Sequence, residues 1–221
     1  MLENLLISSP SLAIFSIDNN FPLIITTLFF CFLFLIKIPS LKIRIATPFI
    51  KFAFEFIIGF RKTYFFILLI YLIFTVSILN NNYYVGIFSV IMLFECIVLY
   101  QISYLEPKYF LLNFYYTPAE FLLFKIKTSI YQSIILIIIP AIFLSIIFPN
   151  TIAPTLIVVT IGFFVVILSV IMRYSFYPDK MNSSVIAVIM ISEWIPPSLV
   201  YLIPIMYSRA KINLKNILTQ C

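Results

Sequence analysis

Long apolar runs constrain this chain more than any other feature of its sequence. The runs cover residues 21–38, 64–79, 84–103, 129–148, 154–172 and 183–207. A hydrocarbon core of about 30 Å needs roughly 20 helical residues at about 1.5 Å each. Because backbone groups in lipid must satisfy their own hydrogen bonds, each run predicts a helix. We expect one all-α domain over residues 1–221, a polytopic transmembrane helix bundle of about six membrane segments.

The overall composition excludes an ordinary soluble fold. Hydrophobic residues make up 63% of the chain and charged residues only 10%, whereas soluble domains are about half apolar and about a quarter charged. No stretch outside the apolar runs is long enough to build a separate core. We therefore expect an integral membrane protein in contact with lipid.

The breaks between the runs alternate between two kinds. The short breaks, 80–83 and 149–154, carry no charge. Eleven of the 14 Lys and Arg residues lie in the longer breaks, which are 37–62, 104–128 and 173–182. By the positive-inside rule the basic loops face the cytoplasm, or the matrix or stroma of an organelle. The opening segment, which contains Glu3 and Asp18 and no basic residue, then faces outside.

The last run has two possible arrangements because Pro196 and Pro197 interrupt it. One continuous kinked span would place Arg209, Lys211 and Lys215 outside, against the charge rule. A re-entrant hairpin, or two short tilted helices, would return these residues to the inside. Each hairpin arm would measure about 18 Å, too short to cross alone, and would need shielding by protein. We favour the hairpin on the charge argument.

The residue inventory removes several kinds of chemistry. The chain has no histidine, so imidazole bases and imidazole metal ligands are absent. Cys31, Cys96 and Cys221 form no CxxC pair or metal-ligand spacing. The basic residues are scattered between apolar runs and form no nucleic-acid-binding face. We expect no catalytic residue, no metal, no cofactor and no nucleic-acid partner, and we do not expect an enzyme.

The second basic loop contains a clear helix start. Thr117-Pro118-Ala119-Glu120 matches a capping box with proline at the first helical position. The helix should continue into the fourth run and form a rigid lever. Glu106 and Lys108 precede it in a mixed apolar and charged surface stretch. The loop is either an ordinary interfacial connection or a docking surface for a cytoplasmic partner.

A similar signal precedes the second run. Residues 49–60 follow Thr47-Pro48, and Lys51 and Glu55 have the i, i+4 spacing of a helical ion pair. We expect an amphipathic helix lying flat at the cytoplasmic interface. The alternative is an extended start of the second span.

Carboxylates within apolar runs are costly in lipid and face protein, water or a substrate path. Glu95 lies near the middle of run 84–103. It is either protonated or paired with a neighbouring hydroxyl, or it acts in transport. Glu193 and Trp194 directly precede the proline pair. They form either the lip of the hairpin or an interfacial carboxylate with its aromatic belt residue.

Together these elements resemble the membrane subunit of type-2 ABC exporters. Segment 105–125 carries the resemblance. In it a short surface stretch precedes a helix start whose residues are, in order, a proline, a small residue, an acidic residue, apolar residues and a lysine. Residues 173–178 and 207–215 are loosely similar to bacterial members, and run 21–38 is additional to the family pattern. In that family this region couples to the ATPase. The resemblance implies that role here for Glu106, Lys108, Thr117, Pro118, Glu120, Phe121 and Lys125.

The resulting hypothesis is a permease subunit of an ABC-type transporter. The chain lacks a GxxxxGK[ST] phosphate loop, so a separate cytoplasmic ATPase must supply the energy. Two copies, or one copy and a related permease, would enclose a path. The candidates on or near that path are Glu95, Glu193, Trp194, Pro196 and Pro197.

The alternative is a non-transporting scaffold or anchor of a larger, possibly organellar, complex. A haem-exporter-like subunit of cytochrome c maturation is a further alternative. We expect the bacterial cytoplasmic (inner) membrane as the location, with an organellar inner membrane as the alternative.

Overall fold

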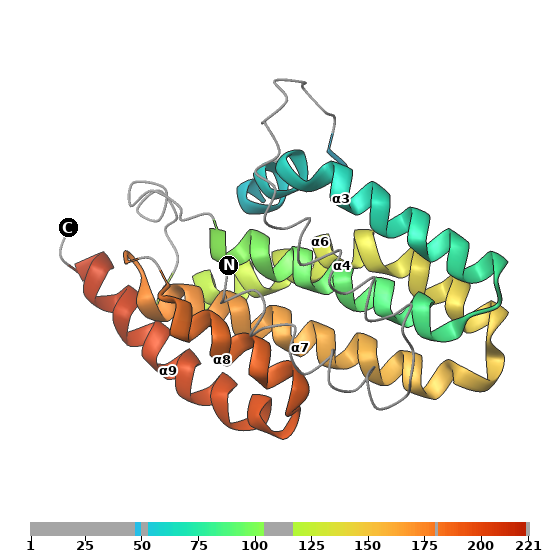
Figure 1. Cartoon of the computed structure of the whole chain (residues 1–221). Coiled ribbons are helices and arrows are strands. Elements are labelled where there is room, and N and C mark those ends of the chain that lie inside the picture. The colour runs from blue at the N-terminus through green and yellow to red at the C-terminus, as the bar shows by residue number, and fades with distance from the viewer. Residues whose placement is uncertain (1–46, 50–52, 104–116, 180, 220–221) are drawn as a thin grey trace. The chain divides into compact units, whose positions relative to one another are not determined.

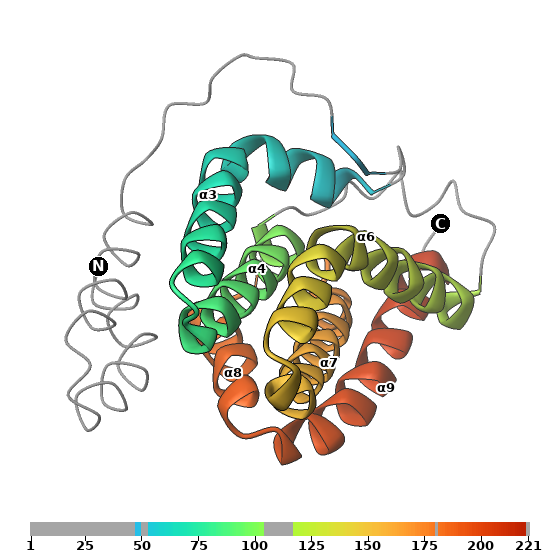
Figure 2. The same ribbon diagram turned by 90° about the vertical axis from the view of Figure 1, so that its right-hand side faces the viewer.

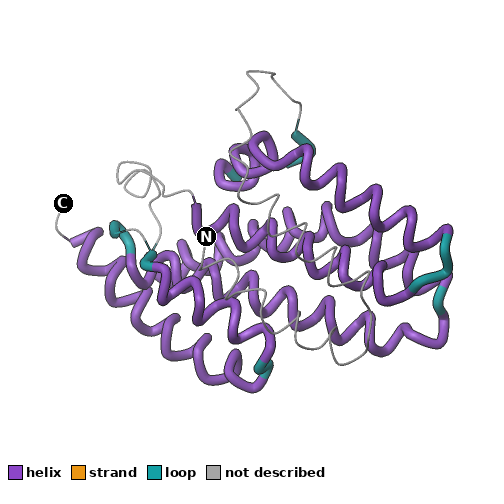
Figure 3. Tube along the Cα trace, viewed as in Figure 1, coloured by secondary structure: helices purple, strands orange, loops and turns teal. Residues whose placement is uncertain are grey.

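The computed structural model describes residues 47–49, 53–103, 117–179 and 181–219. Within these residues every regular element is a helix and no strand occurs (Figure 3). The elements are α3 (Phe54–Leu79), α4 (Tyr83–Ser103), α6 (Pro118–Ile147), the short 3₁₀ helix η1 (Pro149–Thr151), α7 (Ile152–Phe176), α8 (Ser183–Trp194) and α9 (Pro197–Thr219). The all-α prediction is confirmed for this part of the chain.

Four of the described helices are long and apolar enough to cross a membrane. They cover Phe54–Leu79, Tyr83–Ile102, Pro118–Ile147 and Pro149–Phe176. The predicted spans at 64–79, 84–103, 129–148 and 154–172 all fall within them or within one residue of their ends. Run 21–38 lies outside the described residues. Four long apolar helices identify an integral membrane protein.

The last run does not form one helix. α8 ends at Trp194 and α9 begins at Pro197. Pro196 and Pro197 lack the N–H groups that a continuous helix needs, and the residue before a proline avoids helical backbone angles. Two short turns close the break, with Ser198 N donating to the Ile195 carbonyl at 2.9 Å and Leu199 N to the Pro196 carbonyl at 3.1 Å.

Part of the stretch predicted to be an interfacial amphipathic helix belongs to α3. The helix begins at Phe54 and continues without a break to Leu79, so the described part of that stretch forms the first turns of α3. Figure 2 shows these turns, in blue, at an angle to the rest of the helix. Lys51 lies outside the described residues, so its pairing with Glu55 stays a prediction.

α7 occupies the centre of the bundle. It packs against α4, α6, α8 and α9, and α3 packs mainly on α4 (Figures 1 and 2). Short connections make α3 antiparallel to α4 and α6 antiparallel to α7. The start of α3, the end of α4, the start of α6 and the end of α7 therefore share one end of the bundle, which we call the polar end.

α9 runs in the same direction as α7. Leu199 and Ile203 lie beside the α7 segment that contains Ile161 and Phe164. Further along, Ser175 Oγ donates to the Met206 carbonyl at 2.9 Å. Because α7 ends at the polar end and α9 starts beside the middle of α7, α8 must bring the chain back between them (Figure 1).

Two glycines permit close helix crossings. A Cβ at Gly59 would lie 2.3 Å from the Tyr100 ring, and a Cβ at Gly162 would lie 2.5 Å from the Phe94 ring. A larger residue at either glycine would therefore force the facing ring or helix to shift. Although the chain has only 3 glycines, these two allow an aromatic ring to pack directly on a facing backbone, as small residues do at membrane helix contacts.

Candidate functional site

Four helices each contribute one charged or strongly polar side chain to the interior of the polar end. They are Glu55 of α3, Gln101 of α4, Lys125 of α6 and Arg173 of α7, exposed by 4%, 1%, 1% and 2% respectively. We call these residues and Ser129 of α6 the ionic cluster. Such deeply buried charges need partners, because an isolated ion loses its hydration without compensation.

Glu55 lies between the two cations of the cluster. Its Oε1 atom is 3.5 Å from Lys125 Nζ and 3.5 Å from Arg173 Nη1. One carboxylate therefore joins the start of α3 to the start of α6 and to the end of α7. Removing it would leave two like charges close together in a buried site, which is the costly way to break a buried ion pair.

The cluster continues through amide and hydroxyl groups. Arg173 Nη1 donates to Gln101 Oε1 at 3.5 Å, and Gln101 Nε2 donates to Ser129 Oγ at 3.0 Å. A polar connection thus runs from α7 through α4 to α6. One turn deeper on α6, Gln132 is fully buried, and neither its Oε1 nor its Nε2 has a hydrogen-bond partner among the described residues.

Helix lengths place the cluster at one boundary of the membrane-spanning region. Gln101 lies 18 residues from the start of α4, and Arg173 lies 21 residues from the start of α7. At about 1.5 Å per residue these separations are about 27 and 32 Å, close to the thickness of a bilayer core at about 30 Å. The charges are therefore inside the protein but near the aqueous interface.

The helix start predicted at Thr117 is present. Thr117 N donates to Glu120 Oε2 at 2.9 Å, and Glu120 N donates to Thr117 Oγ1 at 3.4 Å. This reciprocal pair is a capping box, and Pro118 occupies the first turn. Thr117 and Glu120 are exposed, so this end of α6 is open to solvent or to a partner.

Phe121 and Lys125 lie one turn apart on the inward face of the same helix. The Phe121 ring packs edge-on against Tyr174 with centroids 5.3 Å apart. Lys125 Nζ reaches the ionic cluster. These two residues therefore connect the helix start to the bundle interior and are not exposed to a partner. Glu106 and Lys108 lie outside the described residues.

The path candidates with described positions lie at other levels of the bundle than the ionic cluster. Glu95 is partly buried on α4, six residues or about 9 Å before Gln101. Pro196 lies in the break between α8 and α9 beside the middle of α7, and Pro197 starts α9. Glu193 and Trp194 end α8, and the structure does not describe their side chains.

Sequence reasoning missed Gln101 and Arg173 as site residues and assigned Glu55 to a local helical pair. A usable signal exists. Glu55, Lys125 and Arg173 all lie within or beside apolar runs. The charges of the loops predict that all three are on the cytoplasmic side of the membrane. Charged residues near run ends on a common side are candidates for mutual pairing. Among the described residues, no group of three Cys, Asp or Glu is placed to hold a metal ion.

Comparison with known proteins adds no assignment. No protein-family model, curated protein or solved structure matches this chain.

Proposed function

We propose that this chain is the membrane-spanning subunit of an ABC-type transporter whose energy comes from a separate ATPase. The observation that carries the proposal is the continuity of α6. Its capped, exposed start and its buried Lys125 belong to one rigid helix, and Lys125 contacts Glu55 of α3 beside Arg173 of α7. A force applied at the start of α6 would reach three other helices through the ionic cluster.

The length of α6 supports a surface contact at this end. Its 30 residues extend about 45 Å, about 15 Å more than a bilayer core. The excess is available outside the hydrocarbon region. Glu120, Leu123 and Lys127 are the exposed residues of the first turns and would form the face that an ATPase contacts.

The orientation follows from charge. Arg61, Lys62 and Lys127 are exposed at the polar end, which would face the cytoplasm. In this orientation α8 and α9 form a re-entrant hairpin, shielded by α7, that returns Arg209, Lys211 and Lys215 to the cytoplasmic side. Glu95 and the proline pair would then lie deeper along the transport path. We place the protein in a bacterial cytoplasmic membrane.

Co-purification with an ATPase tests the proposal. The tagged chain, extracted from its native membrane in mild detergent, should carry a phosphate-loop ATPase whose hydrolysis falls when the two are separated. Leu123→Glu should release the ATPase, because Leu123 is 49% exposed on the proposed contact face. Leu79→Glu is a matched control at the opposite end of the bundle, where Leu79 is 76% exposed.

Each outcome has a clear reading. Loss of the ATPase with Leu123→Glu and retention with Leu79→Glu supports the docking face. A chain that co-purifies with membrane proteins but with no ATPase would be a scaffold subunit, and the transporter proposal would be wrong. Equal effects of both substitutions would remove the start of α6 as the specific contact.

A further inference from the structure

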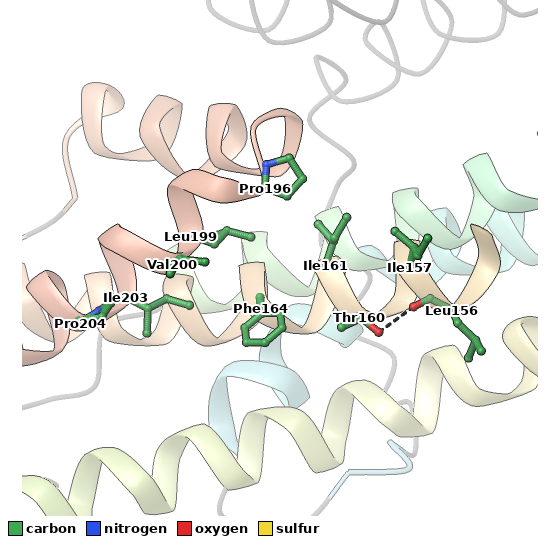
Figure 4. A pocket seen from close by; sticks show the side chains of 10 residues that line it. All are labelled: Leu156, Ile157, Thr160, Ile161, Phe164, Pro196, Leu199, Val200, Ile203 and Pro204. Atoms are coloured by element: carbon green, nitrogen blue, oxygen red, sulfur yellow. Dashed lines mark hydrogen bonds between the residues drawn. The ribbon is translucent and has the colours of Figure 1, made fainter. Parts of the chain in front are cut away.

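An open groove runs between α7 and the first half of α9. Its volume is about 570 Å³, within the range of about 300–1,000 Å³ typical of ligand pockets. Figure 4 shows the α7 residues on one side and the break with Pro196 on the other. The lining includes Leu156, Thr160 and Phe164 of α7 and Val200 and Pro204 of α9.

The lining selects an apolar occupant. Thr160 has the one polar side chain among the lining residues, and its hydroxyl already donates to the Leu156 carbonyl at 2.7 Å (Figure 4). A polar ligand would lose its hydrogen bonds to water and gain none here. A hydrocarbon chain would lose nothing and would gain close contact with the two helices.

Two lysines lie above the groove on the same face of α9. Lys211 follows Pro204 by seven residues and Val200 by eleven, and Lys215 follows Pro204 by eleven. These spacings return to one side of a helix. Both lysines are exposed. Arg209 stacks its guanidinium on the Phe176 ring at 4.6 Å, so it is held beside the end of α7.

The distance along α9 between Lys211 and the groove matches the length of a lipid acyl chain. Lys211 lies about 10 Å along α9 from Pro204 and about 16 Å from Val200. Half of a bilayer core is about 15 Å. Phosphates lie outside that core, about 20 Å from the bilayer centre. A lipid whose phosphate lies beside Lys211 would therefore run its acyl chain past Pro204 and Val200, along the groove.

We propose that this groove binds an acyl chain of an anionic phospholipid and that Lys211 and Lys215 bind its phosphate. The arrangement combines an apolar groove with two cations on the same helix, at the distance from the groove that a phospholipid headgroup would have from its acyl chain. The site involves neither the ionic cluster nor the start of α6, and it shares only Pro196 with the proposed transport path.

Quenching of tryptophan fluorescence tests the site with an intrinsic probe. Trp194 is the single tryptophan of the chain and precedes the groove residue Pro196 by two positions. The full chain would be reconstituted in phosphatidylcholine vesicles that contain a small fixed fraction of lipid with brominated acyl chains. Brominated phosphatidylglycerol should quench with an apparent affinity at least about fivefold above brominated phosphatidylcholine, as expected for a cation near an anionic lipid.

Three variants separate the contribution of the two lysines from that of the apolar groove. The double variant Lys211→Gln with Lys215→Gln should lose the preference for phosphatidylglycerol. Lys127→Gln removes one exposed cation of α6 at the same end and should keep it. Val200→Phe should fill the groove and reduce quenching by both lipids. All four positions are exposed, so the fold should tolerate these changes.

Several results would overturn the proposal. These are absence of quenching, equal quenching of the wild type by both lipids, equal losses with Lys127→Gln and with the double variant, and unchanged quenching with Val200→Phe. A second copy of the chain in the groove would also overturn it. Disulfide-linked dimers through Val200→Cys, with the three native cysteines replaced by serine, would reveal that occupant.

Discussion

Replacing Glu55 with glutamine keeps the shape of the side chain but removes the charge between Lys125 and Arg173. At 3.5 Å each ion pair is worth about 5 kcal/mol before desolvation, with an effective dielectric constant of about 20. Desolvation of the carboxylate offsets much of this gain, and breaking buried pairs costs about 3–5 kcal/mol overall. Since Arg173 keeps its contact with Gln101, we expect the free energy of unfolding to fall by about 3 kcal/mol.

The loss can be measured by reversible unfolding in mixed micelles of a mild detergent and sodium dodecyl sulfate. A second substitution, Lys125→Met, removes one of the two cations and should restore at least about 1 kcal/mol to the Glu55→Gln variant, because neighbouring sites are not additive. Glu120→Gln is the control, since it removes the charge of an exposed carboxylate at a helix cap. A change within about 0.5 kcal/mol for Glu55→Gln, the range of an ordinary surface substitution, would refute the view that the cluster joins the helices.

Two further substitutions test local features. Thr117→Ala removes the side-chain acceptor of the capping box and should cost about 1 kcal/mol. Thr117→Ser should retain stability in the same unfolding assay, and equal losses for both would mean that the box does not stabilise α6. Gly162→Ala places a Cβ 2.5 Å from the Phe94 ring and should cost about 1–3 kcal/mol. Phe94→Leu should recover part of that loss, and an additive double variant would show that the two residues do not compete for space.

We expect the ionic cluster to help a mostly apolar bundle adopt one arrangement at this end. Apolar side chains gain little by preferring one another over lipid. A carboxylate that must face two cations has few alternatives, because every other position leaves a charge unpaired. We therefore expect Glu55 to favour the arrangement in which these ends of α3, α6 and α7 meet.

Local features of the fold could be predicted from the residues alone. Runs of about 20 apolar residues become helices because lipid offers the backbone no other hydrogen-bond partner. The start of α6 follows from Thr117 and Glu120, which bond to each other within one turn. The break at Pro196 follows from the missing N–H groups of the proline pair. Each of these features depends on neighbours in the sequence.

The contacts between helices depend on tertiary packing. A membrane helix is apolar on nearly every face, so its sequence shows little difference between the side that packs and the side that meets lipid. For that reason Lys125 could be placed on a helix but not on its inward face. The pairing of Glu55 with residues 70 and 118 positions away was likewise invisible. Neighbouring residues specify the start of α6 and the break at Pro196, whereas tertiary packing specifies which charges the helices bury together.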